Sequence, residues 1–340
     1  MSGTKQQPTR RPAVAVWPRL GSGAKRQAFN LVGLAVLIAI LSVLTPLFLT
    51  SENVINVLKQ TATVATVGGF FTITMVAGGV DLSVSGVLVL SGAVSVLLVN
   101  AGVPIPIAFA AAVCLGLAVG IVNGLLVSVV RINTVIATLG TLYITTGLAQ
   151  VWTNGKTIAP NNADYAYLGN GTLGPFPILV VVMLIALVVA MILERRGLIG
   201  RYAVLTGSNS AAARLSGIPT RSTLVTLFAL TGAAAGWAGV MVSSQLGAAD
   251  PFADAEFAFE VIIATLLGGT SILGGEGTVV GLLIGALIVS SALTGMNILG
   301  VPSFVQTVLT GVVLIAAVGL DAVSRRPRGL SLRRKPTRNA

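Results

Sequence analysis

The sequence predicts an all-α polytopic membrane protein with about ten transmembrane helices and with cytoplasmic N- and C-termini. Apolar residues make up 54% of the 340 residues and charged residues only 9%, whereas a soluble domain carries about 25% charged residues. A bilayer core about 30 Å thick needs roughly 20 apolar residues for each helical crossing. We expect crossings at residues 28–49, 60–78, 82–100, 104–129, 134–153, 176–193, 222–244, 258–275, 278–298 and 304–323.

The basic residues predict the orientation of these helices. Lysine and arginine are enriched in cytoplasmic loops, and with a cytoplasmic N-terminus only Lys59 and Lys156 fall on the outer side. Residues 1–27 are then expected to form a disordered basic cytoplasmic tail, and residues 28–323 the transmembrane domain. Residues 324–340 are expected to form a second basic cytoplasmic tail.

The net charge of +11 does not indicate a nucleic-acid-binding protein. Six basic residues lie within residues 1–27 and seven within 325–338, and basic tails that flank apolar spans contact anionic lipid. Histidine is absent and Cys114 is the only cysteine, which removes the commonest general base and the usual metal ligands. We therefore expect the lipid bilayer as a partner, no nucleic acid, no metal, no cofactor bound by this chain and no enzymatic activity.

Small residues recur at every fourth position in three of the expected helices. This spacing lets helix backbones approach closely in lipid, where hydrophobic burial does not drive association. We expect tight helix contacts at Gly116, Gly120 and Gly124, at Gly232 and Gly236, and at Gly277, Gly281 and Gly285.

Two acidic residues, Asp81 and Glu276, fall at expected cytoplasmic turns between apolar segments. An acid that precedes a helix can satisfy its free N–H groups and its dipole. Ionisable groups close to the membrane also serve in gating or coupling. The sequence leaves both interpretations open for these two turn residues.

Four threonines lie on one face of the helix expected at 134–153. Thr134, Thr138, Thr141 and Thr145 are spaced by four, three and four residues, so they form one polar stripe. Such a stripe could line a hydrated path for a neutral, hydroxyl-rich solute, with Asn123 and Gln245 as further candidates. The alternative is that these hydroxyls bond to their own helix backbone or hold helices together.

The long basic loop at residues 194–221 contains a helix signal. Ser208 or Asn209 can act as the N-cap, residues 211–215 favour a helix, and Gly217 suits the position after its end. We expect a helix of about two turns at the cytoplasmic face. Its alanine-rich composition is weak for lipid binding and adequate for docking into a protein groove.

Four segments, in order along the chain, resemble the ribose/xylose-type ABC sugar permeases, within the branched-chain amino acid/monosaccharide permease superfamily. The resemblance spans about residues 78–321, the bulk of the chain. Thr146 departs from the pattern, because many members carry an arginine there. The segments are GGVDLSV at 78–84; ATLGT at 137–141 with GLA at 147–149 and TNG at 153–155; GSNSAAARLSGI at 207–218; and GGTS at 268–271 with GGEGT at 274–278.

The resemblance implies that residues 28–323 form a permease domain in the bacterial cytoplasmic (inner) membrane. The permease would pair with a second copy, as a homodimer, or with a homologue, and would receive a monosaccharide from an extracytoplasmic binding protein. A partner ABC ATPase subunit would bind ATP-Mg, and the 194–221 loop would carry the coupling helix. The residues that would couple to the ATPase are Asn209, Ala212, Arg214, Leu215 and Gly217.

Two alternatives to monosaccharide import stay open. The same machinery could import another small solute, such as a branched-chain amino acid, a nucleoside or a sugar-like signal. A stand-alone ion-coupled carrier would instead need an intramembrane network of acids and bases, which this chain lacks beyond Asp81 and Glu276.

Overall fold

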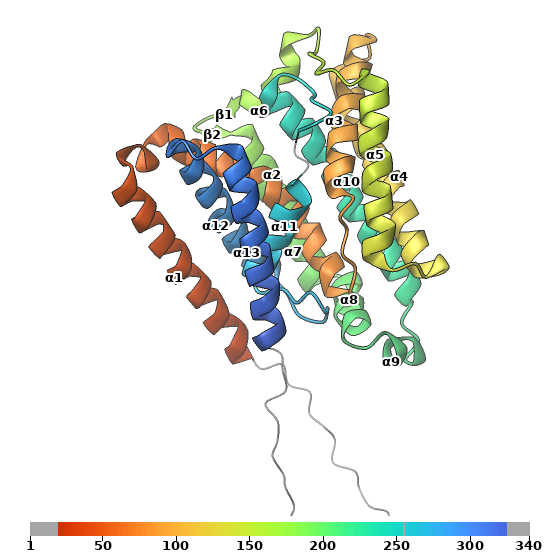
Figure 1. The fold of residues 1–340 in the computed structure, drawn as a ribbon. Coiled ribbons are helices and arrows are strands. Elements are labelled where there is room, and N and C mark those ends of the chain that lie inside the picture. The colour runs from red at the N-terminus through yellow and green to blue at the C-terminus, as the bar shows by residue number, and fades with distance from the viewer. Residues whose placement is uncertain (1–19, 254–255, 325–340) are drawn as a thin grey trace, which may run out of the picture.

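The computed structural model describes residues 20–253 and 256–324, and this part of the chain forms a bundle of helices with one short β-hairpin (Figure 1). The strands β1 (Thr172–Leu173) and β2 (Phe176–Pro177) pair antiparallel. The helices are α1 (Leu20–Leu44), η1 (Pro46–Leu49), α2 (Ser51–Val76), α3 (Val84–Asn100), α4 (Ile105–Leu125), η2 (Leu126–Val130), α5 (Thr134–Thr153), η3 (Ala163–Ala166), α6 (Tyr167–Asn170), α7 (Ile178–Arg195), α8 (Leu198–Ser208), α9 (Ser210–Leu215), α10 (Thr220–Leu246), α11 (Phe257–Leu267), α12 (Val279–Ile298) and α13 (Ser303–Ser324).

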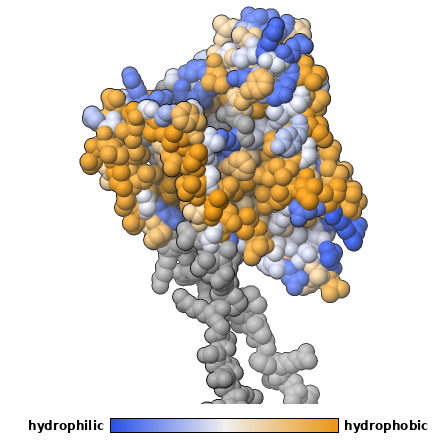
Figure 2. Space-filling model, viewed as in Figure 1, coloured by the Kyte–Doolittle hydropathy of each residue, from blue (hydrophilic) through white to orange (hydrophobic). Residues whose placement is uncertain are grey.

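The helices make the chain a polytopic all-α membrane protein, as the composition predicts. Each of the expected crossings coincides with a helix, and α1, α4 with η2, α5, α7, α10 and α12 are long and apolar enough to span a membrane. Figure 2 shows apolar residues over the middle of the bundle and polar residues gathered towards its two ends. The number of ten crossings and the side of the membrane on which the termini lie stay predictions.

The bounds of three helices differ clearly from the expected ones. Helix α2 begins at Ser51, nine residues before the crossing expected at 60–78. Helix α1 begins at Leu20, so residues 20–27 of the expected N-terminal tail belong to it, while residues 1–19 and 325–340 lie outside the described residues. Helix α11 ends at Leu267, although a crossing over 258–275 was expected. The following turn contains glycines with left-handed backbone, a conformation that does not continue an α-helix.

The expected close helix contacts are present between α4 and α10 and between α11 and α12. A Cβ atom added to Gly116 would overlap the carbonyl oxygen of Gly232, and one added to Gly285 would overlap that of Ala264. The backbones therefore touch without an intervening side chain, and the prediction from the four-residue spacing is confirmed there.

The two ends of the bundle differ in what they carry. The start of α1, the end of α13 and the short helix α9 lie at one end, which we call the α9 end (Figure 1). The connection from α1 to α2 and the last turns of α10 and α12 lie at the opposite end. This arrangement separates the coupling segment expected in the 194–221 loop from any site built on those last turns.

Substituting Gly116 by alanine should destabilise the bundle, because the new methyl group would meet backbone atoms of α10 that have no space to move. We expect Gly116→Ala to lower the free energy of unfolding by about 1–3 kcal/mol, as overpacking does. Gly140→Ala is the matched control, since nothing lies within 4 Å of a Cβ at that position. Thermal unfolding of the purified protein in detergent measures both, and equal midpoints would contradict the packing argument.

Candidate functional site: a polar cavity between four helices

The end of the bundle opposite α9 contains a polar cavity of about 540 Å³. Pockets for small molecules typically measure about 300–1,000 Å³, so this cavity has the size of a ligand site. It lies between α2, α10, α11 and α12, and its polar side chains are five carboxamides, two hydroxyls and one carboxylate. These side chains belong to Asn53, Asn56, Gln60, Gln245, Asn297, Thr63, Thr294 and Glu260.

Helix α2 supplies one wall of the cavity. Its polar residues at 53, 56, 60 and 63 follow the three- and four-residue spacing of one helix face. Thr50 caps the start of α2 by accepting a hydrogen bond from the Asn53 amide, and the Asn53 side chain donates to the Phe48 carbonyl at 2.6 Å. This wall is thus fixed at the point where the chain enters α2.

Helix α12 supplies the facing wall and is tied to α2 across the cavity. The Thr294 hydroxyl donates to the Gln60 side-chain oxygen at 2.9 Å. Asn297 lies one turn further along α12. Gln60 therefore both lines the cavity and joins two of the helices that form it.

The lining is suited to a neutral, hydroxyl-rich solute. Each carboxamide offers donors and acceptors, and each hydroxyl can do either. Among the described residues that line the cavity, Glu260 is the one with an ionisable side chain, and none is a lysine or an arginine. Such a surface can hydrogen-bond to several hydroxyl groups at once but offers no cation to pair with an anionic group.

The cavity does not continue through the bundle to the α9 end. Its α2 wall ends at Val64, and Val67, Phe71 and Met75, which follow towards the α9 end, are all 0% exposed. The structure therefore holds the cavity in a conformation that is closed towards the α9 end.

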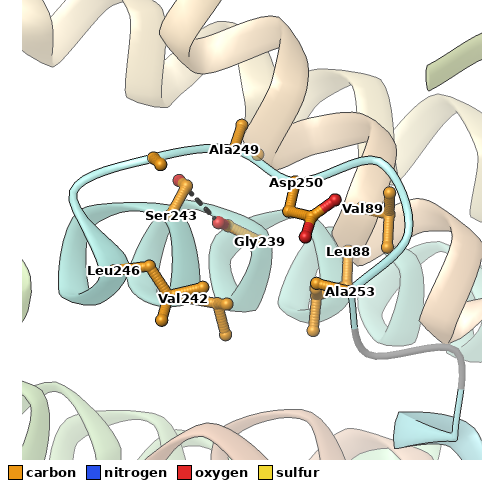
Figure 3. Close-up of a pocket in the computed structure, with 11 residues that line it drawn as sticks. Leu88, Val89, Gly239, Val242, Ser243, Leu246, Ala249, Asp250 and Ala253 are labelled. Atoms are coloured by element: carbon orange, nitrogen blue, oxygen red, sulfur yellow. Dashed lines mark hydrogen bonds between the residues drawn. The ribbon is translucent and has the colours of Figure 1, made fainter. Parts of the chain in front are cut away.

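A second pocket lies beside the cavity and shares Val242 and Leu246 with it. Figure 3 shows that the chain after α10 passes over this pocket and carries Ala249 and Asp250 across it. The Ser243 hydroxyl donates to the Gly239 carbonyl at 2.8 Å. The pocket measures only about 10 Å³, which leaves room for about one water molecule, so the larger cavity is the candidate site.

The threonine stripe of α5 does not line this cavity. Thr138, Thr141 and Thr145 are buried, and helix α5 packs on α3. The Thr138 hydroxyl donates to the Thr134 carbonyl and the Thr145 hydroxyl to the Thr141 carbonyl, both at 2.8 Å. The geometry is that of helix packing, and a role of the stripe in a path stays a prediction.

Asn123 and Asp81 take part in a buried network that joins three segments, the turn before α3 and the helices α4 and α5. The Thr141 hydroxyl donates to the Asn123 side-chain oxygen at 2.6 Å, and the Asn123 amide donates to the Ser83 hydroxyl at 2.8 Å. Both the amide and the hydroxyl of Ser83 donate to one carboxylate oxygen of Asp81. Asp81 thus shapes the turn before α3 and, through Ser83, links it to α4 and α5.

Of the six residues predicted for the path, Gln245 is the one that lines the cavity.

Glu276 is exposed and lies in the glycine-rich turn between α11 and α12. Its carbonyl oxygen accepts a hydrogen bond from the Ser271 amide at 2.9 Å. The carboxylate that reaches the start of α12 belongs instead to Glu194 of α7, which accepts from the Val279 amide at 3.2 Å. Sequence reasoning missed Glu194, because this cap comes from a helix far away in the chain.

The helix expected in the basic loop is present as α9. The Asn209 side chain caps it by accepting from the amides of Ala211 and Ala212 at 3.1 and 3.0 Å, and Gly217 follows it with a φ of 80°. The helix has six residues, Ser210–Leu215, which is close to the two turns expected. Leu215 is 91% exposed, and Arg214 is also exposed.

Apolar helices around a polar cavity that is closed towards one end have the architecture of a membrane transport protein, since polar groups inside a membrane mark solute pathways. The chain belongs to the family described as the permease component of the branched-chain amino acid transport system, which matches residues 53–318. Proteins of this kind are transport subunits of ABC transporters and are not themselves enzymes.

The curated relatives match along most of their length. The ribose import permease protein RbsC of Escherichia coli K12 is 38% identical over 86% of this chain and 92% of that protein. RbsC of Bacillus subtilis is 35% identical over 88% and 94%, and the L-arabinose permease protein AraH of Azospirillum brasilense is 33% identical over 93% and 95%. No solved structure matches the chain.

Replacing Thr141 by valine should destabilise the fold, because the Asn123 side-chain oxygen would lose its donor inside the bundle. An unsatisfied buried acceptor costs about 1–3 kcal/mol. Thr157→Val, at an exposed loop position, is the matched control. Thermal unfolding in detergent measures the difference, and an unchanged midpoint for Thr141→Val would show that the network contributes nothing.

Proposed function

We propose that this chain is the permease subunit of an ABC importer that translocates a neutral monosaccharide. The observation that carries the proposal is the cavity, whose carboxamides and hydroxyls complement a polyol. Relatives named for ribose and arabinose support a sugar as the solute. The structure and the relatives' names thus favour the same chemical class.

The chemistry of the cavity favours a sugar over the other small solutes. A branched-chain amino acid carries a carboxylate, which arginine, lysine or a helix N-terminus can bind. Helices α2 and α11 begin at the cavity, but its one ionisable side chain, Glu260, is acidic and disfavours a second carboxylate. The described residues that line the cavity include no basic side chain. A nucleoside or a sugar-like signal remains the alternative solute, and an ion-coupled carrier that acts alone is the alternative mechanism.

The solute would enter the cavity from the end opposite α9, where an extracytoplasmic binding protein would deliver it. The path then includes Gln245, as the sequence predicts, together with the polar faces of α2 and α12. Polar side chains that face lipid are costly, and Asn56 and Asn297 are exposed on the single chain. A second permease copy in a homodimer, or a homologue, would cover them.

The α9 end would face the cytoplasm and bind the ABC ATPase. Arg214 and the exposed Leu215 offer a charge and an apolar side chain for docking, while Asn209 and Gly217 define the two ends of this coupling helix. ATP-Mg would be bound by the partner subunit, in a complex embedded in the bacterial cytoplasmic (inner) membrane.

Gentle purification of the tagged chain from its native membrane, followed by reconstitution in liposomes, tests the proposal. We expect an ATPase with a phosphate-binding loop to accompany the chain, and sugar uptake to require ATP together with the binding protein. Uptake that follows an ion gradient without any ATPase would overturn the proposal.

Substituting Gln60 by leucine should slow transport, because it removes a lining carboxamide and the acceptor of the Thr294 hydroxyl. One hydrogen bond is worth about 1 kcal/mol, which corresponds to roughly fivefold in rate. Gln150→Leu on α5 is the matched control, because this side chain is not among those that line the cavity. Sugar uptake into proteoliposomes measures both variants, and equal rates would remove Gln60 from the path.

Reversing the charge of Arg214 should weaken docking of the ATPase, because this side chain is exposed on α9. We expect Arg214→Glu to reduce co-purification of the ATPase by roughly tenfold, since charged pairs at interfaces contribute about 1.5 kcal/mol or more. Arg131→Glu, at another exposed arginine, in the connection between η2 and α5, should have a smaller effect. Retention of the ATPase by both variants would place the docking surface elsewhere.

A further inference from the structure

The end of α8 touches the end of α2 and the glycine-rich turn without any side chain between them. A Cβ atom added to Gly207 would overlap the Val76 carbonyl oxygen and would lie 2.8 Å from the Gly275 amide nitrogen. The Gly275 amide donates to the same Val76 oxygen at 2.8 Å. We call the contact of Val76, Gly207 and Gly275 the glycine junction.

Space, rather than backbone conformation, is what requires glycine at position 207. Gly207 lies inside the helix α8 and has no left-handed backbone, in contrast to Gly275 with a φ of 82°. Alanine is the best helix former, so the helix alone would favour it there. The close approach of α8 to the Val76 carbonyl is therefore the physical reason for this glycine.

Three helices that line the cavity begin or end near this junction. Helix α2 ends at Val76 and carries Gln60 about 24 Å away, at 1.5 Å per residue. Helix α12 begins directly after the glycine-rich turn and carries Thr294 and Asn297 at its far end. Helix α10 starts shortly after α9 and carries Gln245 near its far end.

The connections of these helices to α9 differ. Helix α10 follows α9 in the chain, whereas α2 and α12 are distant in sequence and meet the α8–α9 segment through the glycine junction. The Thr294–Gln60 hydrogen bond joins α2 to α12 again at the cavity. A displacement of α9 therefore reaches α10 through the chain, but reaches the other two helices through packing.

We propose that Gly207 is a positioning residue for transport, which makes α2 and α12 move together with the α8–α9 segment. The inference rests on the proposed function, because it takes the ATPase to act at α9. A side chain at position 207 would separate α8 from α2. Displacements of α9 would then reach the two walls that carry Asn56, Gln60 and Asn297 only indirectly, through the packing of α2 on α10.

The test compares Gly207→Ala with Gly140→Ala, a position where a Cβ meets nothing within 4 Å. Both variants are reconstituted with the ATPase and the binding protein, and sugar uptake and ATP hydrolysis are measured together. Coupling between sites is commonly worth a factor of about 5–150. We expect Gly207→Ala to lower the amount of sugar moved per ATP hydrolysed by at least about fivefold, and Gly140→Ala to leave it unchanged.

A second readout follows the cavity itself. Asn56→Cys in a Cys114→Ser background places one thiol in the cavity lining, and its rate of reaction with a polar maleimide is measured with and without ATP and vanadate. We expect the rate to respond to nucleotide in the protein with Gly207, and the response to be lost in Gly207→Ala. An equal response in both, with equal sugar moved per ATP, would overturn the role of Gly207.

Failure of the proposed ATPase coupling can be distinguished from failure of the role of Gly207, and a second variant is available if the first does not fold. If the thiol does not respond to nucleotide even with Gly207 present, the proposed ATPase coupling fails rather than the role of the glycine. If Gly207→Ala does not fold, Gly277→Ala takes its place, because its Cβ would press on side-chain atoms of Thr270 and Val76 beside the junction. A smaller change in the same direction supports the inference, and unchanged coupling overturns it.

Discussion

The close approach of helix backbones through glycine is the constraint on which the rest of this structure depends. In lipid, apolar side chains gain nothing by leaving the surrounding acyl chains, so helices associate through contact area and polar bonds. Gly116 and Gly232 bring α4 against α10, and Gly285 brings α12 against Ala264 of α11. Because α11 and α12 both line the cavity, the second contact fixes the spacing of two of its walls.

The polar residues of the bundle fall into two groups according to how their hydrogen bonds are satisfied. A threonine hydroxyl can donate to the carbonyl four residues earlier, so Thr138 and Thr145 are buried at little cost. A carboxamide has two donors and an acceptor oxygen and cannot be satisfied by its own helix turn. Asn123 needs partners from two other segments, and the carboxamides of α2, α10 and α12 all line the cavity.

This difference explains how much could be predicted from the sequence. The helices, the glycine contacts and the Asn209 cap depend on signals within a few residues, and the structure confirms them. The cavity combines residues from positions 53 to 297, and no local pattern reports which helices will be neighbours. The spacing of Asn53, Asn56 and Gln60 was nevertheless a readable signal, and it was missed because the second crossing was expected to begin at residue 60.

Helix α2 connects the cavity with the α9 end of the bundle, so that one element contributes both to the candidate solute site and to the contact with α8. Its polar residues lie at the cavity, its buried apolar residues Val67, Phe71 and Met75 close the cavity towards α9, and its last residue, Val76, meets α8. Access from the α9 end requires those buried residues to separate from their neighbours. Closely packed interfaces move between discrete arrangements rather than deforming gradually, so a helix held at Val76 and at Gln60 would carry such a change along its whole length.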